Sequence, residues 1–75
     1  MSPVSIKVIR RFGANLRRIR TERGLTQERL AELADVHWTF VGKVERGEVN
    51  LSLRNIARFA LGLKCKPEDL VRDII

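Results

Sequence analysis

Hydrophobic residues recur along the chain at intervals of three or four positions, which is the spacing of one face of an α-helix. The first series consists of Ile9, Phe12, Leu16 and Ile19. Gly24 follows it, and glycine is common just past the C-terminal end of a helix. The chain lacks the regular alternation of apolar and polar positions that is typical of β-strands. We therefore predict a chain built from helices.

Two short helices joined by a tight corner are predicted within residues 26–46. The first begins at Gln27, where the side chain of the preceding threonine can accept a hydrogen bond from a free amide. Asp35 and Val36 leave room only for a tight corner before the second helix, at about residues 38–45. Such a helix-turn-helix presents its second helix outward, where it can enter the DNA major groove. The expected inward-facing residues are Leu30, Leu33, Ala34, Val41 and Val44.

Two further helices are predicted downstream. Ser52 is a suitable N-cap for a helix at about residues 53–63. Pro67 suits the first position of a last helix, at about residues 67–74, because the N–H that proline lacks is not needed there. The expected buried stripe of the longer helix is Leu53, Ile56, Phe59, Ala60 and Leu63. The pattern therefore predicts an all-α fold, a compact domain of five helices that covers residues 1–75.

The charge balance indicates a polyanionic partner. The chain of 75 residues carries 15 Lys and Arg against 9 Asp and Glu, a net charge of +6. The excess is concentrated in residues 1–24, which hold seven basic side chains and one acid. A basic field of this kind suits nucleic acid first and an anionic membrane second. The alternative is that the charge serves solubility alone.

Several function classes lack the residues that they need. The single cysteine, Cys65, and the single histidine, His37, provide neither a disulfide framework nor a set of metal ligands. No nucleophile has a histidine and a carboxylate in a recognised catalytic pattern. No apolar run approaches the ~20 residues that span a bilayer, and the first residues lack a signal-peptide core. We therefore expect a cytoplasmic protein that is not an enzyme, without metal, cofactor, small-molecule ligand or membrane association.

Two segments of the chain resemble the phage-repressor (Cro-like, XRE-type) helix-turn-helix family. The family's helix-turn-helix core is similar to GLTQERLAELADVHWTFVGKVERG, and its second half is similar to NLSLRNIARFALGLKCKPEDLV. The match extends over residues 10–71 with the pieces in order and at matching spacing. The resemblance implies a domain of the lambda-repressor-like DNA-binding type. Stand-alone members include small phage or plasmid repressors and controllers of restriction–modification systems, and the loop RGEVNLSL is similar to that of the controllers.

The resemblance also implies which residues contact DNA. Lys43, on the outer face of the second motif helix, can donate to guanine, and Thr39 can contact a thymine methyl or a base edge. Gln27 stands at a helix start, where free backbone amides and its own side-chain amide can bind a phosphate. The expected base-reading residues are Trp38, Thr39, Gly42 and Lys43. The expected phosphate-contacting residues are Gln27, His37, Arg46, Asn50, Ser52 and Arg54.

Three of these positions leave their roles open. Trp38 departs from the polar or small residue usual in the family, and its indole could pack on thymine methyls or deoxyribose, anchor a protein partner, or fold back on Phe40. His37 stands where Ser or Thr commonly caps the helix, so it is either a substitute cap or a phosphate contact. Gly42 either lets the backbone approach DNA closely or is merely tolerated.

Other residues are expected to serve structure or assembly. The resemblance implies that Arg20 pairs with Glu45 across the first and third helices. Cys65 stands where family members carry valine, which indicates a buried small hydrophobe. An exposed apolar edge near the C-terminus is expected to join two copies of the chain, or else to close the core of a monomer. It consists of Leu61, Val71, Ile74 and Ile75.

These features together predict a sequence-specific transcriptional regulator that binds double-stranded DNA as a homodimer on a two-fold operator. Pairing doubles the sequence that is read and sets the half-site centres about 34 Å apart. The alternative from another class is an antitoxin-type protein-binding module, anchored by Trp38 or by the C-terminal apolar edge. RNA binding ranks third because the chain lacks an aromatic platform for single strands.

Overall fold

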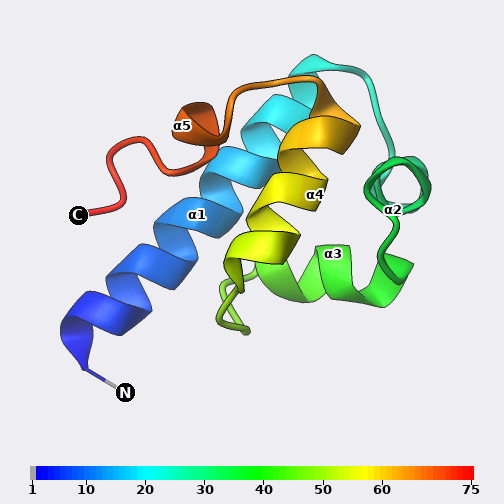
Figure 1. The fold of residues 1–75 in the computed structure, drawn as a ribbon. Helices are drawn as coiled ribbons and strands as arrows, with labels where there is room; N and C mark the ends of the chain where they lie inside the picture. Colours follow the sequence, from blue (N-terminus) through cyan, green and yellow to red (C-terminus); the bar gives the residue numbers. More distant parts are fainter. Residues whose placement is uncertain (1) are drawn as a thin grey trace.

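Five α-helices make up the regular secondary structure of residues 2–75, the part of the chain that the computed structural model describes. Figure 1 shows them in chain order: α1 (Pro3–Glu22), α2 (Gln27–Ala34), α3 (Trp38–Glu45), α4 (Leu53–Leu63) and α5 (Pro67–Leu70). This part of the chain contains no β-strand, so the predicted all-α class is confirmed.

Hydroxyl side chains cap the start of three of the helices. The hydroxyl groups of Ser2, Thr26 and Ser52 accept hydrogen bonds from the amide of the third residue of α1, α2 and α4, at 3.2, 3.0 and 3.2 Å. Each cap satisfies one of the amides that a helix start leaves without an internal partner. Pro67 occupies the first position of α5.

A left-handed residue makes the corner between α2 and α3. Asp35 has φ of 56° and ψ of 50°, a conformation that aspartate tolerates better than most residues. The N–H of Val36 donates back to the carbonyl of Ala31 at 3.0 Å, which closes the end of α2. The chain therefore passes from α2 to α3 within three residues.

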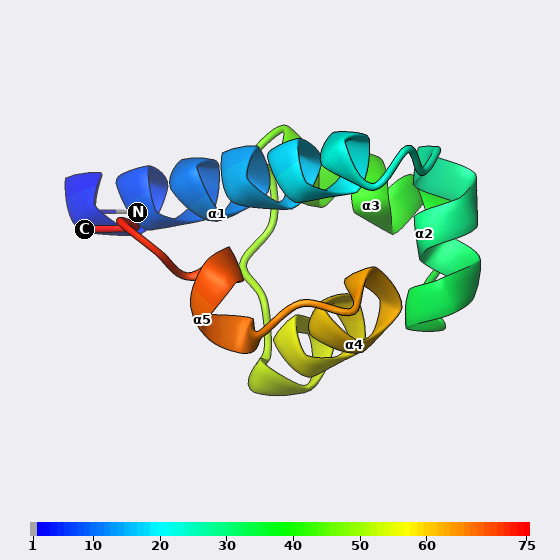
Figure 2. The same cartoon turned by 90° about the horizontal axis from the view of Figure 1, so that it is seen from above.

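The core lies between all five helices. Figure 2 shows α1 as the long rod of the molecule, with α4 and α5 along one side of it and α2 and α3 toward its C-terminal end. Helix α3 packs against both α1 and α2. The large side chains that are fully buried are Leu16, Leu30, Val41, Val44, Phe59, Leu63 and Leu70.

Two glycines let helices approach each other closely. A Cβ at Gly13 in α1 would overlap the carbonyl oxygen of Val44 and lie 2.9 Å from that of Glu45, both in α3. A Cβ at Gly62 in α4 would lie 3.1 Å from the backbone nitrogen of Ala34 in α2. The two glycines therefore set how closely the helix-turn-helix sits on the rest of the protein.

The last helix is shorter than predicted. Helix α5 ends at Leu70, whereas the sequence pattern predicted a helix to about residue 74. The Asn15 side chain donates to the carbonyls of Leu70 and Arg72 at 2.8 and 2.9 Å, and Arg11 donates to those of Asp73 and Ile75 at 3.2 Å. Side chains of α1 thus bind the carbonyls of the tail, which follows α1 instead of continuing the helix.

Three expected core residues lie at its edge. Leu33 is 41% exposed and Leu53 is 85% exposed, although both were predicted to face inward. Leu53 is the first residue of α4, one turn before the core residues of that helix begin. Leu33 lies at the rim, whereas Ala31 and Ala34 of the same helix are buried. Cys65 is half-buried against the core and not fully enclosed.

Candidate nucleic-acid interface

Helix α3 turns one side to the core and the other to solvent. Val41 and Val44 have exposed fractions of 0% and 1%. Trp38, Thr39 and Lys43 are exposed, because their positions lie away from the two valines around the helix. The outward side of α3 is therefore not used by the protein's own interior.

A shallow depression of about 240 Å³ lies at this surface. It is formed by α3 together with the start of α2, because the tight corner brings these two elements side by side. All the residues that line it were predicted to contact DNA: Gln27, Trp38, Thr39, Gly42, Lys43 and Arg46. The remaining candidates, His37, Asn50, Ser52 and Arg54, lie outside this lining.

Gly42 is buried and not open to a close approach of DNA, so the interpretation as an exposed backbone surface is wrong. A Cβ at this position would lie 3.0 Å from Arg46 Nη1 and 3.7 Å from Gln27 Oε1. These two long side chains cover the helix backbone from the next turn and from the neighbouring helix. The glycine therefore makes room for Arg46 and Gln27, the two side chains that carry the polar edge of the depression.

The carboxylate of Glu45 connects three helices behind this surface. Arg20 Nε donates to Glu45 Oε2 at 2.6 Å and Arg20 Nη2 donates to Glu45 Oε1 at 3.1 Å. Gln27 Nε2 donates to the same Oε1 at 3.0 Å, and Arg20 Nη1 donates to the Leu25 carbonyl at 2.8 Å. The side chains of Arg20 and Glu45 are only 12% and 4% exposed.

This network orients Gln27, which was expected to bind a phosphate with its own amide group. The amide is half-buried and already donates to Glu45, so its side chain is fixed in relation to α3. The free backbone amides at the start of α2 remain a site where a phosphate can bind.

Trp38 is exposed and does not fold back on Phe40. Its side chain is 54% exposed, and its ring stacks on that of His37 with centroids 6.0 Å apart and planes inclined by 26°. Phe40 instead stacks on Phe59 in the core, at 6.1 Å and 5°. Of the three roles open to Trp38, only contacts with DNA or with a protein partner remain.

His37 caps α3 as a substitute for the usual hydroxyl residue. Its Nδ1 accepts a hydrogen bond from the N–H of Thr39 at 3.2 Å and lies 2.8 Å from the Thr39 hydroxyl. The ring that caps the helix is the ring on which Trp38 stacks. The start of α3 therefore positions the indole.

The loop before α4 uses its polar side chains locally. Asn50 Oδ1 accepts from the N–H of Leu51 at 3.0 Å, and the Ser52 hydroxyl caps α4. Both residues are exposed, as is Arg54. They flank the start of α4, apart from the residues that line the depression.

Arg46 has a partner that helical spacing could not reveal. Its Nε donates to Glu48 Oε2 at 2.6 Å, and the two side chains are 59% and 50% exposed. The hydrogen bond holds the pKa of Glu48 below its ordinary value and raises that of Arg46. Because the pair is exposed to water, a phosphate can replace Glu48 as the acceptor.

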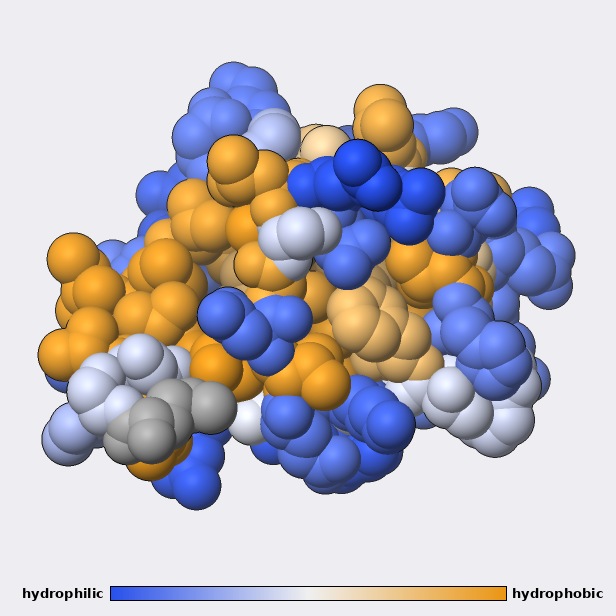
Figure 3. Space-filling model, turned by 60° about the horizontal axis from the view of Figure 1, so that its bottom comes forward, coloured by the Kyte–Doolittle hydropathy of each residue, from blue (hydrophilic) through white to orange (hydrophobic). Residues whose placement is uncertain are grey.

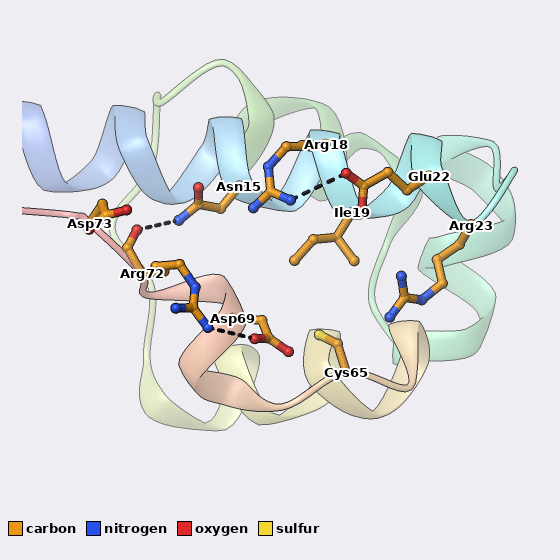
Figure 4. A pocket seen from close by; sticks show the side chains of 9 residues that line it. All are labelled: Asn15, Arg18, Ile19, Glu22, Arg23, Cys65, Asp69, Arg72 and Asp73. Carbon is orange, nitrogen blue, oxygen red and sulfur yellow. Dashed lines mark hydrogen bonds and ion pairs between the residues drawn. The ribbon is translucent and has the colours of Figure 1, made fainter.

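A wider cavity lies between α1 and α5, away from the residues of the depression. It measures about 500 Å³, and Figure 4 shows two ion pairs among the charged side chains that line it. Arg18 meets Glu22 at 3.3 Å and Arg72 meets Asp69 at 3.1 Å. Cys65 also lines the cavity, and burial, with the nearby Asp69 carboxylate second, raises the pKa of its thiol. The thiol therefore stays protonated, as expected for a residue that packs as a small hydrophobe.

A second, apolar groove of about 130 Å³ lies between α1, the loop before α4 and the C-terminal tail. Apolar surface also gathers on the side of the molecule seen in Figure 3. Of the residues expected to join two copies, Val71 and Ile74 line the groove, whereas Leu61 is 78% exposed and does not. The groove is lined by Val8, Ile9, Phe12, Val49, Asn50, Leu51, Ile56, Val71 and Ile74.

Two kinds of feature are missing from the described part of the chain. Residues 2–75 contain no group of three or more His, Cys, Asp or Glu side chains placed to hold a metal ion. The helices in this range are too short or too polar to cross a membrane.

Comparisons with known proteins agree with this geometry. The helix-turn-helix family profile matches residues 16–70. The control protein C.BamHI of Bacillus amyloliquefaciens is 39% identical over 61 residues, which cover 80% of this chain and 75% of that protein. The control protein C.MunI of Mycoplasma sp is 35% identical over 65 residues, with coverages of 85% and 88%.

A solved structure agrees as well. The restriction-modification controller protein C.AhdI from Aeromonas hydrophila superposes with a TM-score of 0.81 at 45% sequence identity, over 83% of this chain and 94% of that one. The family profile matches more than half of the chain, and each of these relatives covers at least 80% of it. The chain therefore belongs to the XRE-type helix-turn-helix family, as the resemblance in its sequence predicted.

Proposed function

We propose that this protein is a sequence-specific DNA-binding transcription regulator that acts on the genes of a restriction–modification system. The observation that carries the proposal is the depression at α2 and α3, where five predicted DNA-contacting side chains meet around the buried Gly42: those of Gln27, Trp38, Thr39, Lys43 and Arg46. Similarity to proteins named as restriction–modification controllers supports the choice of target genes.

Each group at the interface has a distinct role in this proposal. Lys43 reads a base edge in the major groove, since a lysine donates well to guanine O6 and N7. Arg46 and the amides at the start of α2 grip phosphates on either side of the groove. Gln27 links these contacts, because its bond to Glu45 keeps the start of α2 at a fixed position relative to α3.

The proposed active form is a homodimer on a two-fold operator. One helix of eight residues reads only a few base pairs, and a second copy doubles that information. The apolar groove and the exposed Leu53 and Ile75 supply a surface of the kind that self-association covers. Val71 and Ile74 belong to this proposed dimer surface because they line the groove. Leu61 lies about two turns of α4 away from Leu53, outside the groove lining.

Selection of binding sites from a random pool of duplex DNA tests the proposal. We expect the enriched sites to contain two inverted half-sites with centres about 34 Å apart. Affinity for the selected site should fall steeply with added salt, because several phosphate contacts release counterions. Lys43→Ala should relax the preference at one base position of each half-site, by about 1–3 kcal/mol. A pool that returns no consensus, or an affinity indifferent to salt, would contradict DNA recognition by this surface.

A further inference from the structure

Trp38 is the large apolar group on a surface otherwise made of polar side chains and backbone. More than half of the side chain, 54%, is exposed, and it borders the depression together with Lys43, Thr39, Gln27 and Arg46. An indole offers one hydrogen-bond donor and no acceptor, so it cannot make the paired contacts by which polar side chains distinguish bases. What it offers to a partner is mainly an apolar face.

The position of this face is set by the fold. Trp38 is the first residue of α3, and the N-terminal residues of a recognition helix are those that reach base edges. Its ring rests on His37, at 6.0 Å between centroids. His37 is in turn held by the N–H of Thr39 and lies 2.8 Å from the Thr39 hydroxyl. The ring of His37 therefore positions the indole in the protein without DNA.

The edges of base pairs in the major groove carry a single type of apolar group. It is the C5-methyl of thymine, which cytosine acquires only when it is methylated at C5. An apolar ring that enters the groove on the first turn of a helix gains the most free energy from contact with such a methyl group.

We propose that Trp38 reads the C5-methyl group of a pyrimidine in each half-site, so that the protein senses cytosine C5-methylation as well as thymine. This inference rests on the proposed function, since it requires that α3 binds duplex DNA. It predicts that binding depends on the methyl group itself, independently of the hydrogen bonds of the base pair that carries it.

The test uses the duplex selected from the random pool, prepared in four versions. At each pyrimidine position of the half-site in turn, the base in both half-sites is thymine, deoxyuridine, 5-methylcytosine or cytosine, and the affinity of the full chain is measured by fluorescence anisotropy. Within the pair of thymine and deoxyuridine, and within the pair of 5-methylcytosine and cytosine, the two duplexes differ by one methyl group per half-site. We expect the wild-type chain to bind thymine over deoxyuridine, and 5-methylcytosine over cytosine, by about fourfold per half-site, the factor for burial of one methyl-sized group.

Variants assign the effect to the indole. Trp38→Ser should bind the members of each pair equally, while its helical circular dichroism and melting stay as in the wild type because the side chain is exposed. Lys43→Ala should lose overall affinity but keep both methyl ratios. Thr39→Ser should keep them as well, since it retains the hydroxyl near His37.

The outcomes separate the inference from the proposed function. Sequence-specific binding by the wild type with methyl ratios of one at every pyrimidine overturns the inference and leaves the proposed function standing. The same holds if Trp38→Ser retains the ratios, because another group then reads the methyl. Failure of the wild type to bind any selected duplex overturns the proposed function itself.

Discussion

At the scale of single residues, the carboxylate of Glu45 is the group on which the interface depends most. It accepts from Arg20 on α1 and from Gln27 on α2, while its own helix carries the proposed recognition surface. With 4% of the side chain exposed, it is shielded from water in a way that the other ion pairs of residues 2–75 are not. A buried pair of this kind is sensitive to the loss of one partner, because the other charge stays buried.

Glu45→Gln should therefore lower the free energy of unfolding by about 3–5 kcal/mol, since Arg20 then lacks its counter-charge. Urea denaturation followed by circular dichroism measures this loss. The matched control is Glu22→Gln, which removes the same charge from an exposed pair with Arg18 and should change stability by less than about 1 kcal/mol. Equal effects of the two substitutions would show that the Glu45 network contributes no special stability.

Residue-level predictions from the sequence succeeded where helical spacing alone decides exposure. The outward positions of Trp38 and Lys43 follow from the inward positions of Val41 and Val44. Burial of Gly42 could not be predicted in this way, because the atoms that cover it belong to the ends of Arg46 and Gln27. Where a long side chain lies depends on its hydrogen-bond partners, and periodicity contains no information about them.

At the scale of elements, helix positions are governed by how closely the backbones approach each other. Gly13 and Gly42 both lie inside helices, yet their surroundings differ. A Cβ at Gly13 would overlap the backbone oxygen of Val44, whereas a Cβ at Gly42 would meet the mobile end of Arg46. Backbone cannot move aside without shifting a whole helix, while the end of an arginine side chain can.

The same substitution should therefore have opposite effects at the two glycines. Gly42→Ala gains helix propensity and is expected to raise the free energy of unfolding by up to about 1 kcal/mol. Gly13→Ala must push α3 away from α1 and should lower the free energy of unfolding by about 1–3 kcal/mol. Thermal and urea unfolding of both variants measure the difference. A stabilised Gly13→Ala would mean that α3 does not rest on α1 as closely as the structure has it.

The limits of element prediction show most clearly at α5. The apolar spacing of Leu70, Val71 and Ile74 fits a longer helix, and proline and acidic residues at its start strengthen that interpretation. What ends the helix is a set of hydrogen bonds from Asn15 and Arg11, which are far away in sequence. The helices α2, α3 and α4, whose predicted bounds agree with the structure, begin and end with signals in their own residues, whereas α5 ends through a tertiary contact.

The first turn of α5 should depend on pH through Asp69. A hydrogen bond from Arg72, with a second from the N–H of Lys66, lowers the pKa of Asp69. Because this pKa is lowered on folding, the ionised Asp69 carboxylate stabilises the folded protein above the pKa of an unfolded aspartate, ~3.9. This stabilisation is lost as the pH falls through the pKa that Asp69 has in the folded protein.

Asp69→Asn should therefore be less stable than the wild type at neutral pH, and the difference should shrink on acidification below about pH 4. Denaturation midpoints of the two proteins between pH 7 and pH 2.5 measure it. A stability difference that is constant over this range would show that the ionised carboxylate has no part in holding α5.

At the scale of the whole molecule, the depression at α2 and α3 carries the basic Lys43 and Arg46, whereas the groove between α1 and the C-terminal tail is apolar. The net charge of +6 favours approach to DNA, but it also opposes the association of two copies. A dimer interface must therefore gain most of its free energy from apolar burial. Leu53 suits this role because it is 85% exposed and lies one helical turn from Ile56, which lines the apolar groove.

A projecting side chain beside a groove on the same face can become self-complementary under a two-fold axis, with each copy filling the groove of the other. Leu53→Asp should then weaken self-association by at least tenfold, because a two-fold interface contains the substitution twice and each buried leucine contributes about 1.5–3 kcal/mol. Leu61→Asp is the matched control, since Leu61 is 78% exposed on the same helix about 12 Å further along. Sedimentation equilibrium of both variants gives the association constants. If Leu61→Asp dissociates the dimer and Leu53→Asp does not, the two copies meet through the C-terminal half of α4 and not through the apolar groove.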